Sequence, residues 1–132
     1  MTVSSTTTKS SANGDGSTTT FPYAFKIFDE DDISVIIRAS DGTETVKTIT
    51  THYTVTGVGS GSGGNVVFTS GNIPASGETV VLLRATARTQ LTDYVANDPF
   101  PAATHEDALD KLTFIAQEIE EELGRSIKVS KT

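Results

Sequence analysis

The sequence contains no cysteine and no tryptophan, and only four of its 132 residues are proline. Without cysteine, the chain can form no disulfide and offers no thiolate as a metal ligand or nucleophile. The longest apolar runs, such as residues 80–83, are too short to cross a bilayer, and the N-terminus lacks the basic start and apolar stretch of a signal peptide. We therefore expect a soluble protein without a membrane partner, made in a cytoplasm.

Positive charge is scarce as well. Ten Lys and Arg residues stand against seventeen Asp and Glu, which gives a net charge of −7. The cations in the strand region and just after it are scattered singly, at Lys26, Arg38, Lys47, Arg84 and Arg88. An acidic surface without a basic patch repels phosphate backbones, so the composition argues against a nucleic-acid partner.

Ser, Thr and Gly are abundant, and short apolar segments alternate with turns. Apolar residues recur at every second position over residues 21–27, which indicates a strand, and further strands are expected at 33–38, 43–49, 53–57, 65–69 and 78–84. Residues 43–49 should pair with 33–38 across the Asp41-Gly42 turn. The turn signal at residues 13–16 predicts an N-terminal hairpin of residues 3–11 and 17–21, with a disordered tail as the alternative.

This pattern predicts a mainly β fold, an antiparallel β-sandwich or open barrel followed by an extended connector and a C-terminal α-helix. We place the β-rich domain at residues 1–86, the connector at 87–103 and the helix segment at 104–132. The connector assignment rests on its prolines, each of which biases the preceding residue away from helical geometry.

The helix should begin with Thr104 as N-cap and end near Gly124. Its apolar residues are spaced four, three, four and four, so they form one stripe: Ala108, Leu112, Ile115, Ile119 and Leu123. Two interpretations stay open. The stripe packs against the chain's own sheet, or parallel copies of the chain share it as a bundle.

Motifs that carry chemistry are weak in this sequence. Residues 59–64 match G-x-G-x-x-G, but a strand follows where a dinucleotide site needs a helix. The acidic run at residues 29–32 lacks the Gly and distal Glu of an EF-hand and is expected to be a solvated turn. His52 and His105 fall in different elements. We predict no catalytic residue, no metal site and no cofactor, and therefore no enzyme.

The segment after the strands carries the most specific pattern. It contains RTQLTDY at 88–94, NDPFPA at 97–102, His105-Glu106 and ALDKL at 108–112. Together with FKIF at 25–28 and YTV at 53–55, these stretches resemble the N-terminal domain of T7-like phage tail fibres. The resemblance covers about residues 1–124.

The resemblance implies a structural virion protein located in the phage tail and made in the host cytoplasm. In that family the N-terminal domain fixes a trimeric fibre to the tail, so the expected partners are tail tube, adaptor or nozzle proteins and two further copies of the chain. A separate distal fibre or tailspike is a further expected partner, if the chain is a free-standing adaptor and not the anchor part of a longer fibre. The alternatives are a small host-binding adhesin and a tailspike fragment that degrades polysaccharide.

Two sets of residues carry these expectations. The connector holds Phe100 between two stiff prolines, which suits docking on the tail at a low entropic cost, although Phe100 packing on the chain's own sheet is the competing interpretation. The expected tail-docking residues are Asp98, Pro99, Phe100 and Pro101. The expected trimer interface is the helix stripe, Ala108, Leu112, Ile115, Ile119 and Leu123.

Overall fold

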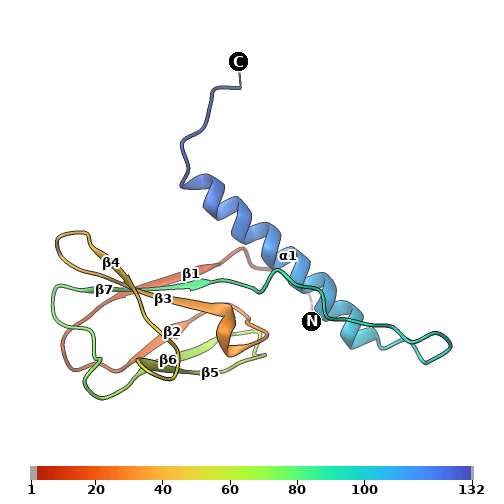
Figure 1. Ribbon diagram of the computed structural model, residues 1–132, viewed down its shortest axis with the longest axis horizontal. Helices are drawn as coiled ribbons and strands as arrows, with labels where there is room; N and C mark the ends of the chain where they lie inside the picture. The colour runs from red at the N-terminus through yellow and green to blue at the C-terminus, as the bar shows by residue number, and fades with distance from the viewer. Residues whose placement is uncertain (1–2, 132) are drawn as a thin grey trace. The chain divides into compact units, whose positions relative to one another are not determined.

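A computed structural model describes residues 3–131 of the chain. Its elements are strands, one short 3-10 helix and one long α-helix (Figure 1). In chain order they are β1 (Lys9–Asn13), β2 (Thr20–Tyr23), η1 (Glu30–Asp32), β3 (Ile33–Arg38), β4 (Glu44–Val46), β5 (Tyr53–Thr56), β6 (Gly64–Phe68), β7 (Thr79–Arg84) and α1 (Ala102–Gly124).

The strands form two antiparallel sheets, in the orders β1-β7-β3-β4 and β2-β6-β5. In the first sheet β7 is central, with Leu82 opposite Val35 of β3 and opposite Ser10 of β1. In the second sheet β6 is central, with Val66 opposite Phe21 of β2 and opposite Val55 of β5. The predicted fold class, mainly β with a C-terminal helix, is confirmed.

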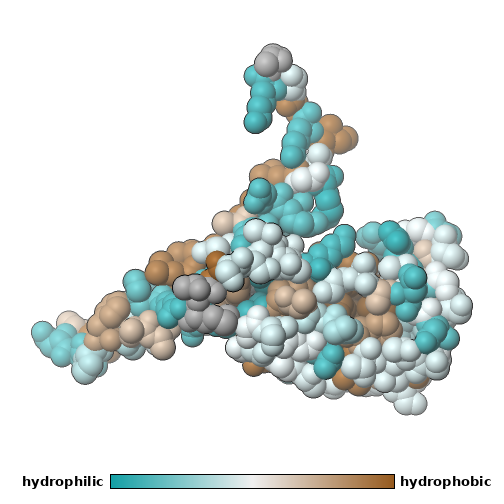
Figure 2. Space-filling view, turned by 180° about the vertical axis from the view of Figure 1, so that it is seen from behind, coloured by the Kyte–Doolittle hydropathy of each residue, from teal (hydrophilic) through white to brown (hydrophobic). Residues whose placement is uncertain are grey.

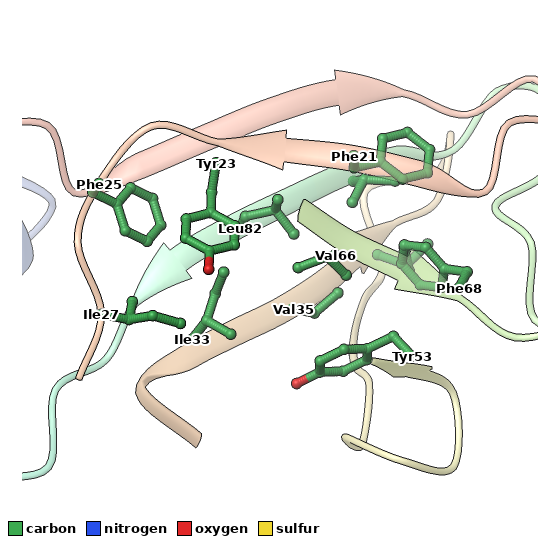
Figure 3. Close-up of a cluster of buried hydrophobic side chains, with 12 residues drawn as sticks. Phe21, Tyr23, Phe25, Ile27, Ile33, Val35, Tyr53, Val66, Phe68 and Leu82 are labelled. Carbon is green, nitrogen blue, oxygen red and sulfur yellow. The ribbon is translucent and has the colours of Figure 1, made fainter. Parts of the chain in front are cut away.

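A single apolar core lies between the inner faces of the two sheets (Figure 3). The strands β2, β3, β5, β6 and β7 contribute to it, and their buried residues alternate with less buried ones, because successive side chains of a strand point to opposite faces. The buried residues are Phe21, Tyr23, Phe25, Ile27, Ile33, Val35, Ile37, Tyr53, Val66, Phe68, Val80 and Leu82. The alternation read over residues 21–27 therefore continues to Ile27, beyond the end of β2, and it marks burial correctly.

The expected N-terminal hairpin is wrong. The turn signal does make a turn, with Gly16 at a positive φ of 81°, but the strands on its two sides do not pair. β1 pairs with β7 in one sheet, and β2 pairs with β6 in the other. The turn therefore carries the chain from one sheet to the other.

That turn is held by the carboxylate of Asp15. It accepts hydrogen bonds from the Thr18 hydroxyl at 2.6 Å and from the backbone N–H groups of Thr18 at 2.6 Å and Ser17 at 2.8 Å. These bonds, the Thr18 hydroxyl first, hold the pKa of the Asp15 carboxyl well below its ordinary 3.8. A group whose folded-state pKa is lowered stabilises the fold above its unfolded-state pKa, and this stabilisation is lost as the pH falls through the folded-state pKa.

We therefore expect Asp15→Asn to lower the melting temperature at about pH 7 and to lower it much less at about pH 2. The substitution removes the charged acceptor, whose contribution is already reduced at pH 2 in the wild type, because the unfolded chain gains a proton there. Thermal unfolding followed by circular dichroism at both pH values measures the difference. An equal drop at both pH values would mean that the carboxylate charge does not stabilise this turn.

The acidic run is a capped 3-10 turn, but it is only partly solvated. The Asp29 carboxylate accepts the backbone N–H of Asp31 at 3.0 Å, as a cap of η1. Asp32, in contrast, is buried, and its Oδ1 accepts the backbone N–H of Ala87 at 3.1 Å. The expectation of a solvated turn is thus wrong for Asp32, whose carboxylate ties the chain after β7 to the start of β3.

The glycine-rich segment forms the loop of the β5–β6 hairpin, as the following strand indicated. Gly63 has a φ of 91°, and a Cβ at this position would collide with the carbonyl oxygen of Tyr23. This glycine thus serves close approach of two backbone segments and not phosphate binding.

The helix begins earlier than expected. It starts at Ala102 with Pro101 as N-cap and no side-chain capping hydrogen bond, so Thr104 is not the N-cap. A proline at this position costs no helix hydrogen bond and disfavours helical geometry at Phe100 before it, so Pro101 marks the boundary. The helix ends at Gly124, as expected. Within residues 3–131, no helix combines the length and apolarity needed to cross a membrane.

The chain forms two compact units. One is Thr7–Ala87, which holds all seven strands of the described residues and is called the β unit below. The other, called the helical unit, joins residues 3–6 with residues 88–131. The three-part division expected from the sequence, at 1–86, 87–103 and 104–132, stays a prediction.

Candidate functional site

The connector between β7 and α1 has neither strand nor helix, yet it has a defined turn. The backbone N–H of Asp98 donates to the carbonyl oxygen of Val95 at 3.3 Å. Asn97, inside this turn, has a φ of 70°, in the left-handed region that asparagine tolerates better than most residues. The turn reverses the chain and brings Phe100 back beside Tyr94.

Three rings gather where the connector meets the helix. The Tyr94 and Phe100 rings are stacked, with centroids 5.3 Å apart and planes 20° apart. The His105 ring lies 5.0 Å from Phe100, and its Nδ1 is 3.3 Å from the Tyr94 hydroxyl. We call these residues, Tyr94, Phe100 and His105, the aromatic cluster. The first two remain substantially exposed, Tyr94 at 44% and Phe100 at 62%.

A cavity of about 160 Å³ opens beside the aromatic cluster. Residues from both arms of the connector turn line it: Asp93, Tyr94, Val95, Asp98, Pro99, Phe100 and Pro101. The four expected tail-docking residues, Asp98, Pro99, Phe100 and Pro101, therefore all line a single hollow. Sequence reasoning missed the residues of the other arm, because nothing in the spacing indicates that Tyr94 stacks on Phe100.

The helix stripe is exposed. Leu112 is 62% exposed, and Ile119 and Leu123 are exposed as well, while Ala108 and Ile115 are half-buried. Leu109 adds a further exposed apolar side chain beside the stripe. Apolar surface is visible along α1 and the connector in Figure 2, coloured brown. The helix therefore presents its most apolar face to solvent in the single chain.

The opposite face of α1 is buried and largely acidic. It carries Asp110, Phe114 and Glu118, spaced by four residues. Glu118 is thus buried although it lies outside the apolar stripe. An amphipathic helix normally buries its apolar stripe, so this arrangement is the reverse of the usual one.

Two segments of the helical unit, at residue 5 and at residues 88–89, make polar contacts with the helix. The Arg88 guanidinium forms an ion pair with Glu122 at 3.1 Å, and the Lys111 ammonium donates to the carbonyl oxygen of Thr89. Gln117 donates through Nε2 to the carbonyl oxygen of Ser5 at 3.0 Å. Polar contacts, and not the apolar stripe, thus hold residues 5 and 88–89 to the helix.

His52 and Tyr23 make hydrogen bonds within the β unit. His52 accepts the backbone N–H of Thr48 through Nδ1 at 2.9 Å, in the turn before β5. The Tyr23 hydroxyl donates to the carbonyl oxygen of Thr56 at 2.6 Å, and burial raises its pKa. In residues 3–131, no three His, Asp or Glu side chains are grouped so that they could hold a metal ion.

Comparison with known proteins relates the chain to a phage protein. No protein-family model matches the chain, so the resemblance to T7-like tail fibre domains stays a prediction. The tail spike protein of Salmonella phage epsilon15 is 36% identical over 128 residues, which are 97% of this chain and 12% of the phage protein. The match covers nearly the whole chain, and the chain spans only a small part of that relative. Both of its compact units are therefore similar to one segment of a phage tail spike protein, which relates the chain to the tail proteins of phages.

Proposed function

We propose that the chain is a structural module of a phage tail that anchors a trimeric tail fibre or tailspike to the virion. The observation that supports this proposal most directly is that 97% of the chain matches 12% of a tail spike protein. A segment that makes up a small part of a long spike, and that shows no catalytic arrangement in its described residues, suits attachment better than chemistry.

The connector supplies the tail-facing surface in this proposal. Asp98, Pro99, Phe100 and Pro101 lie beside one hollow, and Phe100 is mostly exposed. Two prolines fix much of the local backbone before binding, so less conformational entropy is lost when a partner docks. The partners are tail tube, adaptor or nozzle proteins.

The apolar stripe of the helix forms the trimer interface in this proposal. Leu112, Ile119 and Leu123 would leave a continuous apolar stripe in water if the chain stayed alone, and exposed apolar stripes of this kind mark interaction surfaces. The stripe runs along the helix at coiled-coil-like spacing, so three parallel copies bury it together. The helical bundle then continues the threefold axis toward a fibre shaft or a separate distal fibre.

Binding to tails tests the anchor function directly. The purified chain is mixed with phage tails that lack their spikes, and co-sedimentation is measured over a range of chain concentrations. We expect saturable binding to tails and no binding to host cells. Absence of tail binding would contradict the proposed anchor function.

The two alternatives have their own readouts in the same experiment. Binding to host cells without tails would indicate a small adhesin. Release of reducing sugars from host surface polysaccharide by this chain alone would indicate a polysaccharide-degrading tailspike fragment.

A further inference from the structure

We propose that the connector cavity receives one cationic side chain, lysine or arginine, from the protein to which the chain docks. This inference rests on the proposed function, because it names the chemistry of the docking partner. It is drawn from the size of the cavity, the rings beside it and the charges at its edge.

The size of the cavity selects a side chain over a small-molecule ligand. Its volume is about 160 Å³. Pockets for cofactors and drug-sized ligands usually hold roughly 300–1,000 Å³. A hollow of the observed size, open to solvent at its rim, suits one long side chain from a protein surface.

The wall of the cavity suits a cation. Tyr94 and Phe100 are stacked on each other and both are substantially exposed, so ring surface remains accessible at the hollow. The electron-rich faces of aromatic rings attract ammonium and guanidinium groups within roughly 6 Å of the ring centroid. A flat guanidinium also stacks well on such a ring.

The charge at the rim of the cavity is negative, which suits a cationic occupant. Asp93 and Asp98 both line the cavity and are exposed, and within residues 3–131 neither carboxylate has a hydrogen bond or ion pair. From residue 93 to residue 110 the chain has no Lys or Arg, and its charged residues are Asp93, Asp98, Glu106, Asp107 and Asp110.

The cations that flank this stretch are already engaged. Arg88 pairs with Glu122, and Lys111 donates to the carbonyl oxygen of Thr89. Two unpaired carboxylates at the cavity therefore lack a cation from the chain itself. Charge complementarity selects a basic occupant and disfavours a phosphate or an acidic peptide.

The rim is held in shape before the occupant arrives. Pro99 and Pro101 flank Phe100, and the turn at Asn97 closes through the Asp98–Val95 hydrogen bond. Because this backbone is already ordered, a single side chain can be bound at a low entropic cost.

The test uses the full chain and three blocked tripeptides, Gly-Arg-Gly, Gly-Leu-Gly and Gly-Glu-Gly, as probes. Two-dimensional amide NMR spectra are recorded at increasing millimolar peptide concentrations. We expect Gly-Arg-Gly alone to shift the signals of residues 93–105, with shifts that shrink as salt rises. Equal shifts with Gly-Leu-Gly, or none with Gly-Arg-Gly, would overturn the proposal.

Variants separate the roles of charge and ring. Asp93→Asn with Asp98→Asn should weaken Gly-Arg-Gly binding about tenfold, and Phe100→Ala should weaken it by a similar factor. Glu44→Gln with Glu30→Gln, which removes two exposed carboxylates of the β unit, should leave binding unchanged. Unchanged signals of α1 beyond residue 105, together with those of the β unit, establish that both units of each variant are folded. Undiminished binding by the Asp93/Asp98 variant contradicts the cationic occupant.

Tail binding of the same variants distinguishes this inference from the anchor function. If the Asp93/Asp98 and Phe100 variants co-sediment with tails as well as the unchanged chain, the cavity is not the docking point and the anchor function stands. If Gly-Arg-Gly binds at residues 93–105 but no variant or unchanged chain binds tails, the cation site stands and the anchor function fails.

Discussion

Phe68→Ala is expected to lower the free energy of unfolding by about 3–5 kcal/mol. The Phe68 side chain is 3% exposed and lies between the two sheets. Its ring meets Phe21 edge-on, with centroids 5.6 Å apart at 90°, and it lies 6.2 Å from Tyr53. Truncation therefore removes buried area and leaves a cavity among rings that cannot collapse into it.

The loss is large compared with the stability of the β unit. A unit of this length is typically stable by roughly 4–12 kcal/mol, so one truncation removes a large fraction of it. The melting temperature should fall by at least about 12 °C, measured by circular dichroism at 220 nm or by calorimetry. Phe100→Ala is the matched control, because its ring is 62% exposed, and it should change the stability by less than about 0.5 kcal/mol. Similar losses in both variants would contradict the core assignment.

The second large effect concerns the state of association. At high micromolar concentration the unchanged chain should have a mass about three times 13.9 kDa in sedimentation equilibrium or light scattering. Leu112→Glu with Ile119→Glu should return it to the monomer mass and raise the dissociation constant by about a hundredfold or more. Each buried Leu or Ile contributes about 1.5–3 kcal/mol, and three copies of each added carboxylate would repel one another in the trimer interface.

The control makes the same chemical change outside the stripe. Ile127→Glu with Val129→Glu alters two fully exposed residues beyond the helix and should leave the trimer mass unchanged. Far-ultraviolet circular dichroism checks that α1 stays helical in every variant. A wild type that stays at the monomer mass would refute self-trimerisation through the helix. A stripe variant that stays at the trimer mass would place the trimer interface elsewhere.

The alternation of apolar residues predicted most of the β unit because burial on one face of a strand leaves a direct trace in the sequence. The expected strands at 33–38, 53–57, 65–69 and 78–84 are found at Ile33–Arg38, Tyr53–Thr56, Gly64–Phe68 and Thr79–Arg84. The hairpin of residues 33–38 with 43–49 is also found, with β4 reduced to Glu44–Val46.

Pairing between strands that are far apart in the sequence leaves no such local pattern. The turn at Gly14–Gly16 is encoded locally, but the partner of β1 is β7, some seventy residues further along the chain. A strong turn signal therefore predicted the bend and not the strand that follows it in the sheet. The same holds for Gly63, whose role depends on the Tyr23 backbone from a different strand.

The candidate site was foreseen in part. Prolines on both sides of Phe100 indicated a stiff aromatic segment, and the spacing from Ala108 to Leu123 indicated one apolar helix face. Tyr94 stacks on Phe100 because the chain reverses direction at Asn97, and the sequence analysis did not predict this reversal. The burial of Glu118 opposite an exposed Leu112 could not be predicted, because hydropathy alone assigns the apolar face to the interior.

The first and last strands of the β unit lie next to each other. The backbone N–H of Arg84 donates to the carbonyl oxygen of Thr8 at 2.9 Å, directly beyond the β1–β7 ladder. Both ends of the β unit thus leave from the same end of one sheet. Tension between the segments before Thr7 and after Ala87 would act on one end of this ladder. It would break the hydrogen bonds one after another and would not load all of them at once. In the proposed anchor function, the load of a fibre would therefore have to pass through contacts such as Gln117–Ser5, which bypass the strands.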